Sequence, residues 1–337
     1  MAQEIAHPPV VVITGATAGV GRAVASRFAQ DKAKIGLIAR GMDRLEATKA
    51  EVEEAGGEAL ICQCDVADAE AVDRAASAVE DHFGPIDIWI NVAFAGMMAP
   101  FVDISMEEFK RVTEVTYLGQ VHGTHAALRR MLPRDRGSIV LVGSALAYRG
   151  IPLQSPYCGS KHAIQGFQDS LRCELLHMKS NVHVSMVQLP GVNTPEFDWM
   201  RTTMPMTLRP ASPPYQPEVA ADAIHFAAHS KRKEVVFGWW ALAAVWADKM
   251  ASPLLDYYLA RTGIDSQQTS EPIAPDRQDN LFEPVPGDPG AHGRFDEEAH
   301  GRSRELWLTK HRGQAALGAA LALAAGGIAW LGSRRTA

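Results

Sequence analysis

Three side chains that could transfer a proton lie in the stretch from residue 144 to residue 161. They are Ser144, Tyr157 and Lys161, with twelve residues between the first two and three between the last two. A free phenol has a pKa near ~10, and a lysine ammonium close to it lowers that pKa by favouring the phenolate. The set therefore predicts a proton donor, a lysine that tunes it and a hydroxyl that orients a substrate oxygen. Three unrelated polar residues are the alternative, and a second motif has to decide between the two.

The segments on either side would position these residues. Residues 137–143 form an apolar run long enough for a buried strand, and residues 163–178 carry apolar side chains at helical spacing. Ser144 should therefore stand at the carboxyl end of a strand. Because Tyr157 and Lys161 are four residues apart, they should lie one turn apart on one face of the following helix.

A glycine-rich turn near the N-terminus supplies the second motif. Residues 10–14 are a β-branched run typical of a buried strand, and a helical pattern begins after residue 21. A turn between a strand and a helix lets backbone N–H groups approach a pyrophosphate at the helix N-terminus. The chain here reads TGATAGVG, which contains Thr14, Gly15, Gly19, Val20 and Gly21.

Together the two motifs, TGxxxGxG followed by S-x12-Y-x3-K, resemble those of the short-chain dehydrogenase/reductase family. The resemblance covers residues 8–240. It implies a Rossmann-type domain with a seven-stranded parallel sheet, hydride transfer to or from a nicotinamide cofactor, and a homodimer or tetramer formed through the helices that start near Met106 and Pro156. It also implies that Ser144, Tyr157 and Lys161 are catalytic. The alternative is a dinucleotide-binding regulator or scaffold without turnover, and the intact Ser-Tyr-Lys set argues against it.

The periodicity of the chain predicts the fold class without the resemblance. Alternating strands and helices are typical of an α/β protein with a doubly wound parallel sheet. Ligands bind beyond the carboxyl ends of the strands in such sheets, where Gly15, Asn91, Ser144 and Pro190 are expected. Strands are expected at 33–39, 58–62, 87–91, 182–189 and 234–237, and helices at 42–55, 68–83, 106–132 and 217–230.

The end of the second expected strand favours NADP(H), with NAD(H) as the alternative. An acidic residue there would accept hydrogen bonds from the ribose 2′-hydroxyl of NAD. This chain has Arg40 at that place and no carboxylate before Asp43. A guanidinium binds a 2′-phosphate through charge-assisted hydrogen bonds, whereas a carboxylate would repel it.

The family resemblance implies further cofactor contacts. These are Asp65 and Val66 at the adenine, Asn91 and Ala93 near the nicotinamide ribose, Tyr157 and Lys161 at the ribose hydroxyls, and Thr194, after the Pro190-Gly191 turn, at the carboxamide.

Two segments depart from the family pattern. After the fourth strand the family usually shows N-N-A-G, whereas this chain reads NVAFAG over residues 91–96, so that the tight glycine is displaced. In the long helix, Thr116 occupies the position of a usual asparagine. That asparagine is thought to hold a water that links the lysine to solvent. Thr116 could hold such a water through its hydroxyl or through its backbone carbonyl.

Apolar residues dominate the three loops expected around the nicotinamide. Met97 follows the fourth strand, Leu146 and Ile151 follow Ser144, and Phe197 follows the Pro-Gly turn. Methionine in particular adapts to loosely shaped apolar ligands. These loops predict a small apolar carbonyl or alcohol substrate, with ordinary core packing as the alternative for each residue.

Composition argues against several other classes. The formal net charge of −6 provides no basic surface for nucleic acid. The four cysteines form no disulfide framework, and no histidine near them completes a metal site, so no metal is expected. The first residues lack a basic flank and do not resemble a signal peptide. Because NADP(H) and reduced thiols suit the cytoplasm, a cytoplasmic catalytic domain is expected.

The C-terminal part of the chain changes composition twice. A catalytic domain is expected over residues 1–263, with an aromatic extension at 239–263 that packs on the domain or on a membrane surface. Residues 264–309 are polar and rich in Pro and Gly, which predicts a loose linker. Residues 310–337 contain a run without charged residues between basic flanks. As a helix this run would nearly span a bilayer and anchor the enzyme, with a helix docked on protein as the alternative.

Overall fold

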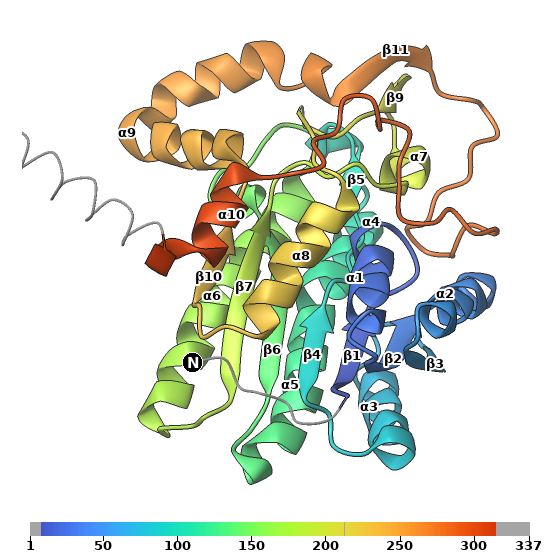
Figure 1. Ribbon diagram of the computed structural model, residues 1–337. Helices are drawn as coiled ribbons and strands as arrows, with labels where there is room; N and C mark the ends of the chain where they lie inside the picture. Colours follow the sequence, from blue (N-terminus) through green and yellow to red (C-terminus); the bar gives the residue numbers. More distant parts are fainter. Residues whose placement is uncertain (1–7, 212, 315–337) are drawn as a thin grey trace, which may run out of the picture.

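A parallel sheet of seven strands forms the centre of the computed structural model, which describes residues 8–211 and 213–314 (Figure 1). The strand order is β10-β7-β6-β4-β1-β2-β3. The chain runs outward in one direction from β1 and in the other from β4, so the ends of these two strands flank the crevice where such sheets bind ligands. The strands are β1 (Val10–Thr14), β2 (Lys34–Ala39), β3 (Glu58–Gln63), β4 (Ile88–Asn91), β6 (Ser138–Ser144), β7 (His183–Leu189) and β10 (Glu234–Val236).

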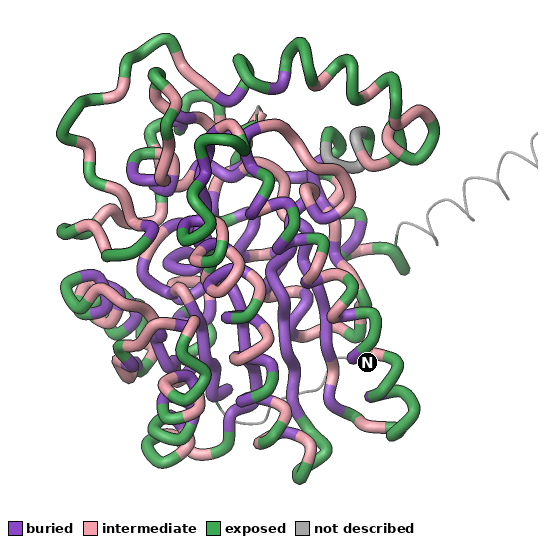
Figure 2. The backbone as a smooth tube through the Cα atoms, turned by 180° about the vertical axis from the view of Figure 1, so that it is seen from behind, coloured by how far each residue is buried: buried purple, intermediate pink, exposed green. Residues whose placement is uncertain are grey.

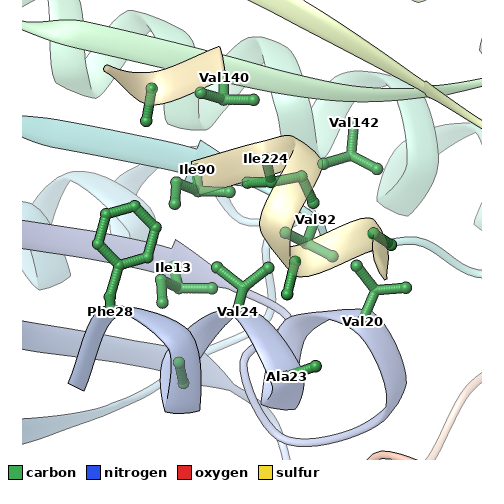
Figure 3. Close-up of a cluster of buried hydrophobic side chains, with 14 of the residues drawn as sticks. Ile13, Val20, Ala23, Val24, Phe28, Ile90, Val92, Val140, Val142 and Ile224 are labelled. Atoms are coloured by element: carbon green, nitrogen blue, oxygen red, sulfur yellow. The ribbon is translucent and has the colours of Figure 1, made fainter. Parts of the chain in front are cut away.

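Helices cover both faces of the sheet, which confirms the predicted doubly wound α/β fold. The face that packs against α1 and α8 holds Val24, Phe28 and Ile224 in one buried cluster with Ile13 and Ile90 of the sheet (Figure 3). The helices on this face are α1 (Gly19–Ala29), α2 (Met42–Glu54) and α8 (Pro217–Ala228), and those on the other face are α3 (Ala69–Phe83), α4 (Met106–Thr113), α5 (Gly119–Met131) and α6 (Ser155–His177).

The central strands are buried along their whole length. Every residue of β1, β4 and β6 is buried, and Figure 2 shows the sheet as a continuous buried layer. Strands covered on both faces consist of nearly continuous apolar runs, which is why these segments could be recognised in the sequence. The sheet therefore forms a rigid base for the loops at its carboxyl edge.

The helix expected over residues 106–132 is interrupted. It begins at α4 with a capping box, in which Ser105 and Glu108 each bond the backbone of the other. Residues Glu114–Leu118 then form a π-helical turn, η2, before the chain continues as α5. Single π-helical turns within α-helices are frequent at functional sites, and Thr116 lies inside this one.

Residues 264–309 differ from the loose linker predicted from their composition. Leu281 and Phe295 are buried, and Asp288 forms a salt bridge to Arg22 at 3.1 Å. The amide of Asn193 donates to Asp296 at 2.8 Å. A few apolar residues and many polar contacts to the domain thus hold this segment on the surface. Its elements are β11 (Gln268–Pro272), which pairs with β9 (Met206–Leu208), and α10 (Arg304–Lys310).

The extension forms α9 (Trp239–Thr262), a long helix with a kink at Ala251 that lies along the carboxyl edge of the sheet (Figure 1). Within residues 8–211 and 213–314, no helix is both long enough and apolar enough to cross a membrane. The predicted anchoring tail falls mostly on residues 315–337, outside the described residues. The remaining short elements are β5 (Met97–Met98), which pairs with β8 (Arg201–Thr202), and α7 (Glu196–Trp199).

Candidate active site

The glycine turn between β1 and α1 requires residues without side chains. Gly15 has a φ of +69°, and its N–H donates to the carbonyl of Ile38 at 2.7 Å. A Cβ atom at Gly21 would lie 1.9 Å from the carbonyl oxygen of Gly15. The turn thus packs tightly against the first turn of α1, which is the arrangement that binds a pyrophosphate.

A pocket opens beside this turn, with about 930 Å³ of space that is partly open to solvent. It runs along the carboxyl edge of the sheet from Arg40, at the end of β2, to Phe94, after β4. Its glycine cradle and the charged side chains of Arg40, Arg44 and Asp65 along a mostly apolar lining fit a dinucleotide. The predicted cofactor residues that line it are Gly15, Gly19, Val20, Gly21, Arg40, Asp65, Val66, Ala93 and Thr194.

Asn91, predicted to line the nucleotide, points into the core instead. Its side-chain oxygen accepts from the indole N–H of Trp89 at 3.0 Å, and its amide donates to the Thr124 hydroxyl at 3.2 Å. Successive side chains of a strand point to opposite faces, and the residue type alone does not tell which face a strand-end residue takes. Asn91 therefore fixes the end of β4 rather than touching the pocket.

Three further predicted cofactor residues support the pocket without lining it. The Thr14 hydroxyl accepts from the N–H of Val92 at 3.2 Å, which holds the ends of β1 and β4 side by side. Pro190 and Gly191 form the turn after β7. Gly191 packs so closely on Ala211 that a Cβ would lie 2.3 Å from its carbonyl oxygen.

Arg40 lines the pocket at the end of β2, but its guanidinium already has protein partners. It donates to the backbone carbonyls of Asn280 and Phe282, both at 2.6 Å. Arg44, on α2, donates to two further carbonyls of the same segment. We call residues 279–288 the strap, because Asn280 and Pro284 from this segment line the pocket beside both arginines. No sequence signal identified the strap, since backbone carbonyls are present in every sequence.

Asp65 is tied to the strap through an arginine. It accepts from Arg111 at 2.5 Å and from the N–H of Ala67 at 2.9 Å. Arg111 also donates to the carbonyl of Leu281 at 3.0 Å. Burial raises the pKa of Asp65, but these hydrogen bonds outweigh it and hold the pKa below its ordinary value. Asp65 therefore lines the pocket as a charged carboxylate, and its position depends on Arg111.

Glu196 is a pocket residue that the sequence analysis missed. One of its carboxyl oxygens accepts from the Trp199 indole at 2.9 Å and from the Asn280 amide at 3.1 Å. The other oxygen is buried and has no hydrogen-bond partner among the described residues. Burial raises the pKa of this carboxyl above its ordinary value. A buried polar atom without a partner beside a pocket is suited to a ligand donor such as a hydroxyl or an amide.

The structure brings Ser144, Tyr157 and Lys161 together as the spacing predicted. Ser144 is the last residue of β6, and the other two lie in the first two turns of α6. The Ser144 hydroxyl accepts from the N–H of Leu146 at 3.2 Å, and it lies close enough to the Tyr157 hydroxyl to lower the pKa of that phenol. The Lys161 ammonium lies 5.4 Å from the centroid of the Tyr157 ring and donates to the carbonyl of Val142 at 2.7 Å.

The electrostatics of this group differ from the prediction that Lys161 lowers the pKa of Tyr157. Burial raises the pKa of Tyr157 above its ordinary value, and the nearby Ser144 side chain opposes this only in part. Burial also lowers the pKa of Lys161 to about 7. A lysine that loses part of its charge near neutrality stabilises a nearby phenolate less. The Tyr157 phenol is therefore protonated at neutral pH in this arrangement, ready to act as a proton donor.

Thr116 uses its hydroxyl on the displaced loop after β4. This hydroxyl donates to the carbonyl of Ala95 at 2.7 Å and accepts from the N–H of the same residue at 2.9 Å. Thr116 is fully buried. Because its only proton is given to Ala95, the hydroxyl cannot donate to a water near Lys161. It could hold such a water only by accepting a hydrogen bond from it, and both routes predicted for the proton relay stay predictions.

Phe94 connects the pocket to the three catalytic candidates. Its ring stands edge-on to the Tyr157 ring with centroids 5.7 Å apart, and the Lys161 ammonium lies 6.0 Å from its centroid. The same residue lines the pocket. The sequence analysis noted the displaced glycine but not that this displacement places an aromatic ring beside Tyr157.

The predicted substrate residues have different surroundings. Met97 is fully buried and packs in the core of the α3–α6 face, so its assignment to the substrate pocket is wrong. Phe197 packs against a small buried cluster that includes Met200. Leu146 and Ile151, in the loop after Ser144, are partly exposed. Their contact with a substrate stays a prediction.

The family model described as short chain dehydrogenase matches residues 9–204. An uncharacterized oxidoreductase, YxnA, from Bacillus subtilis is 30% identical over 330 residues, which are 97% of this chain and 90% of that protein. Human dehydrogenase/reductase SDR family member 7 is 35% identical over 170 residues, which cover 49% of this chain and 50% of its own.

Solved structures show the same architecture. An alcohol dehydrogenase from the archaeon Thermococcus sibiricus, complexed with 5-hydroxy-NADP, superposes with a TM-score of 0.60 at 26% identity. The match covers 68% of this chain and 96% of that one. The chain therefore belongs to the short-chain dehydrogenase/reductase family, whose members are NAD(P)-dependent oxidoreductases that act on CH–OH or carbonyl groups.

Proposed function

We propose that this protein is an NADP(H)-dependent oxidoreductase that interconverts an apolar ketone or aldehyde and the corresponding alcohol. The observation that carries the proposal is the grouping of Tyr157 with Lys161 and Ser144 beside Phe94, at the end of a pocket built on the glycine turn. A binding module would not need a protonated phenol and an orienting hydroxyl at that place. The nicotinamide, when bound, supplies or accepts the hydride.

The side chains supply the proton and the alignment. In the reducing direction the Tyr157 hydroxyl gives its proton to the carbonyl oxygen of the substrate, and Ser144 donates a hydrogen bond that holds this oxygen in place. The buried Lys161 ammonium stabilises the phenolate that remains until a proton returns. Its pKa of about 7 allows it to exchange that proton near neutral pH.

The preference for NADP(H) rests on charge at the adenosine end. Arg40 and Arg44 line this end, and the last residue of β2 is Ala39 instead of an acid. The Thermococcus alcohol dehydrogenase with its NADP derivative supports a nicotinamide dinucleotide in this pocket. The proposal of an apolar substrate rests on Phe94, whose ring stands against Tyr157, and on Leu146 and Ile151 in the loop after Ser144.

The test is Tyr157→Phe, assayed with NADPH against a panel of lipophilic ketones and aldehydes. We expect kcat to fall by about 10²–10⁴-fold, the contribution of a positioned general acid, while the affinity for NADPH stays within about twofold. Tyr258→Phe, on the exposed part of α9, is the matched control and should retain full activity. Unchanged turnover in Tyr157→Phe would refute the assignment.

We propose further that the catalytic domain is cytoplasmic and forms a homodimer or tetramer through α4, α5 and α6. Thiols without disulfide partners at Cys62, Cys64, Cys158 and Cys173 agree with a reducing compartment. The run without charges after residue 313 supports an anchoring tail. Sedimentation of the full chain would test the oligomeric state. Carbonate extraction of the full chain would test the anchoring tail.

A further inference from the structure

Several large apolar side chains of the helix α9 point away from the protein. Its exposed large side chains include Trp246, Met250, Leu254 and Tyr257, and Met250 is 83% exposed. A surface helix normally packs its apolar stripe on the core and shows its polar side to water. Large exposed apolar patches mark interaction sites.

The opposite side of α9 holds it to the domain through polar contacts. Arg149, in the loop after Ser144, donates to Asp248 at 2.8 Å and to Ser252 at 3.1 Å, and it also binds Asp256. Positions two residues apart on a helix lie on nearly opposite sides. Asp248 therefore lies opposite Trp246 and Met250. The aspartates of this helix are therefore bound on the side of Arg149, and the exposed Trp246 and Met250 lie on the outer side.

The outward face repeats in both halves of the helix. Before the kink at Ala251, Trp239, Trp246 and Met250 follow one another at spacings of seven and four residues, and all are exposed. After the kink, the exposed residues are Leu254, Tyr257 and Tyr258. The two tyrosines lie three and four residues after Leu254, and Arg261 lies four and three residues after them. The spacing places each set on one side of its half-helix.

We propose that this outward face of α9 binds the surface of a lipid bilayer. Tryptophan and tyrosine predominate on it, and these residues are enriched where a membrane meets water. The basic residues Lys249 and Arg261 are exposed beside them, while both acids of the helix are bound by Arg149. The face is therefore positively charged, as contact with anionic lipid head groups requires.

A second copy of the chain is a poorer occupant. A two-fold contact brings the same patch of both subunits together, so two faces that each carry Lys249 and Arg261 would meet, and their like charges disfavour association. The proposal goes beyond oxidoreductase activity, and it does not depend on the C-terminal tail. Because Arg149 belongs to the loop after Ser144, a bound bilayer would lie beside the entrance to the substrate side.

The test is hydroxyl-radical oxidation of the full chain, read by mass spectrometry, with and without vesicles of phosphatidylcholine and phosphatidylserine. Met250 is the reporter, and Met178, exposed on the far end of α6, is its matched control. We expect vesicles to slow the oxidation of Met250 by about tenfold, because an interfacial helix buries its apolar face in the bilayer. Met178 should change by less than about twofold.

Two variants distinguish membrane binding by α9 from membrane binding by the C-terminal tail. The parent and both variants retain the tail. In Trp246→Glu/Leu254→Glu, Met250 should oxidise with vesicles as fast as without them. In Leu176→Glu, whose side chain is 70% exposed against 72% for Leu254, protection of Met250 should persist. Membrane association without protection of Met250 would overturn the proposal. Protection of Met250 before vesicles are added would also overturn it, since the tail or a second copy would then cover this face.

Discussion

The hydroxyl of Thr116 binds both backbone polar groups of Ala95, with its carbonyl at 2.7 Å and its N–H at 2.9 Å. Each of these residues lies where the chain departs from the family pattern, one in the usual asparagine position and the other in the loop with the displaced glycine. The two departures therefore compensate one another. The π-helical turn carries the threonine that fixes the loop, and the loop carries Phe94 to the Tyr157 ring.

Thr116→Val should destabilise the protein and disturb the site together. The substitution keeps the side-chain volume but leaves the buried N–H and C=O of Ala95 without partners, at a cost of about 2–4 kcal/mol. Thr116→Ser restores the hydroxyl and should lose less than about 1 kcal/mol. Equilibrium unfolding in urea measures both, and equal stability of the valine variant and the parent would contradict this account of the loop.

The buried Lys161 should make stability depend on pH. Burial lowers its pKa from 10.5 to about 7, so between these values the unfolded chain binds more protons than the folded one. Stability from this residue is therefore smallest below pH 7 and rises with pH up to about 10.5, by at most ~1.4 kcal/mol per pH unit.

Lys161→Met isolates this contribution, because every other group titrates in both proteins. The free energy of unfolding, measured in urea near pH 7 and near pH 9, should rise less with pH in the variant than in the parent. An identical rise in both proteins would mean that Lys161 keeps an ordinary pKa in the folded state.

Arg40→Ala should reduce the preference for NADPH over NADH. Losing a charge-assisted contact to the 2′-phosphate should weaken NADPH binding by about 10- to 100-fold, with NADH affected by less than about threefold. Arg277→Ala is the matched control, because that arginine also donates to backbone carbonyls but does not line the pocket. Calorimetry measures the dissociation constants of NADPH and NADH for the parent and both variants. Tighter binding of NADH than of NADPH by the parent would refute the preference for NADPH.

Sequence reasoning found what local patterns encode and missed what distant contacts build. The glycine turn and the Ser144, Tyr157 and Lys161 set were predicted because each depends on a short segment between a strand and a helix. The direction of the Asn91 side chain was not predicted, since both sides of a strand end offer polar partners. The hydrogen bond from Arg40 to the carbonyl of Phe282 was not predicted either. It joins residues far apart in the chain, and its acceptor is a backbone oxygen, which every residue has. The polar composition of that segment suggested a linker, although a few apolar side chains suffice to dock it.

The strap provides the last prediction. Leu281 is fully buried in the core of the α3–α6 face, and its carbonyl binds Arg111, the partner of Asp65. Leu281→Ala should therefore cost about 2–5 kcal/mol in unfolding free energy, as large-to-small substitutions in a core do. Its neighbour Phe282 is 43% exposed and serves as the control, because Phe282→Ala keeps the carbonyl that binds Arg40 and should cost much less. Urea unfolding of both variants distinguishes a docked strap from a loose linker, which predicts no loss in either. If the strap is docked, Leu281→Ala should also weaken cofactor binding, since Arg40 and Asp65 then lose the segment that positions them.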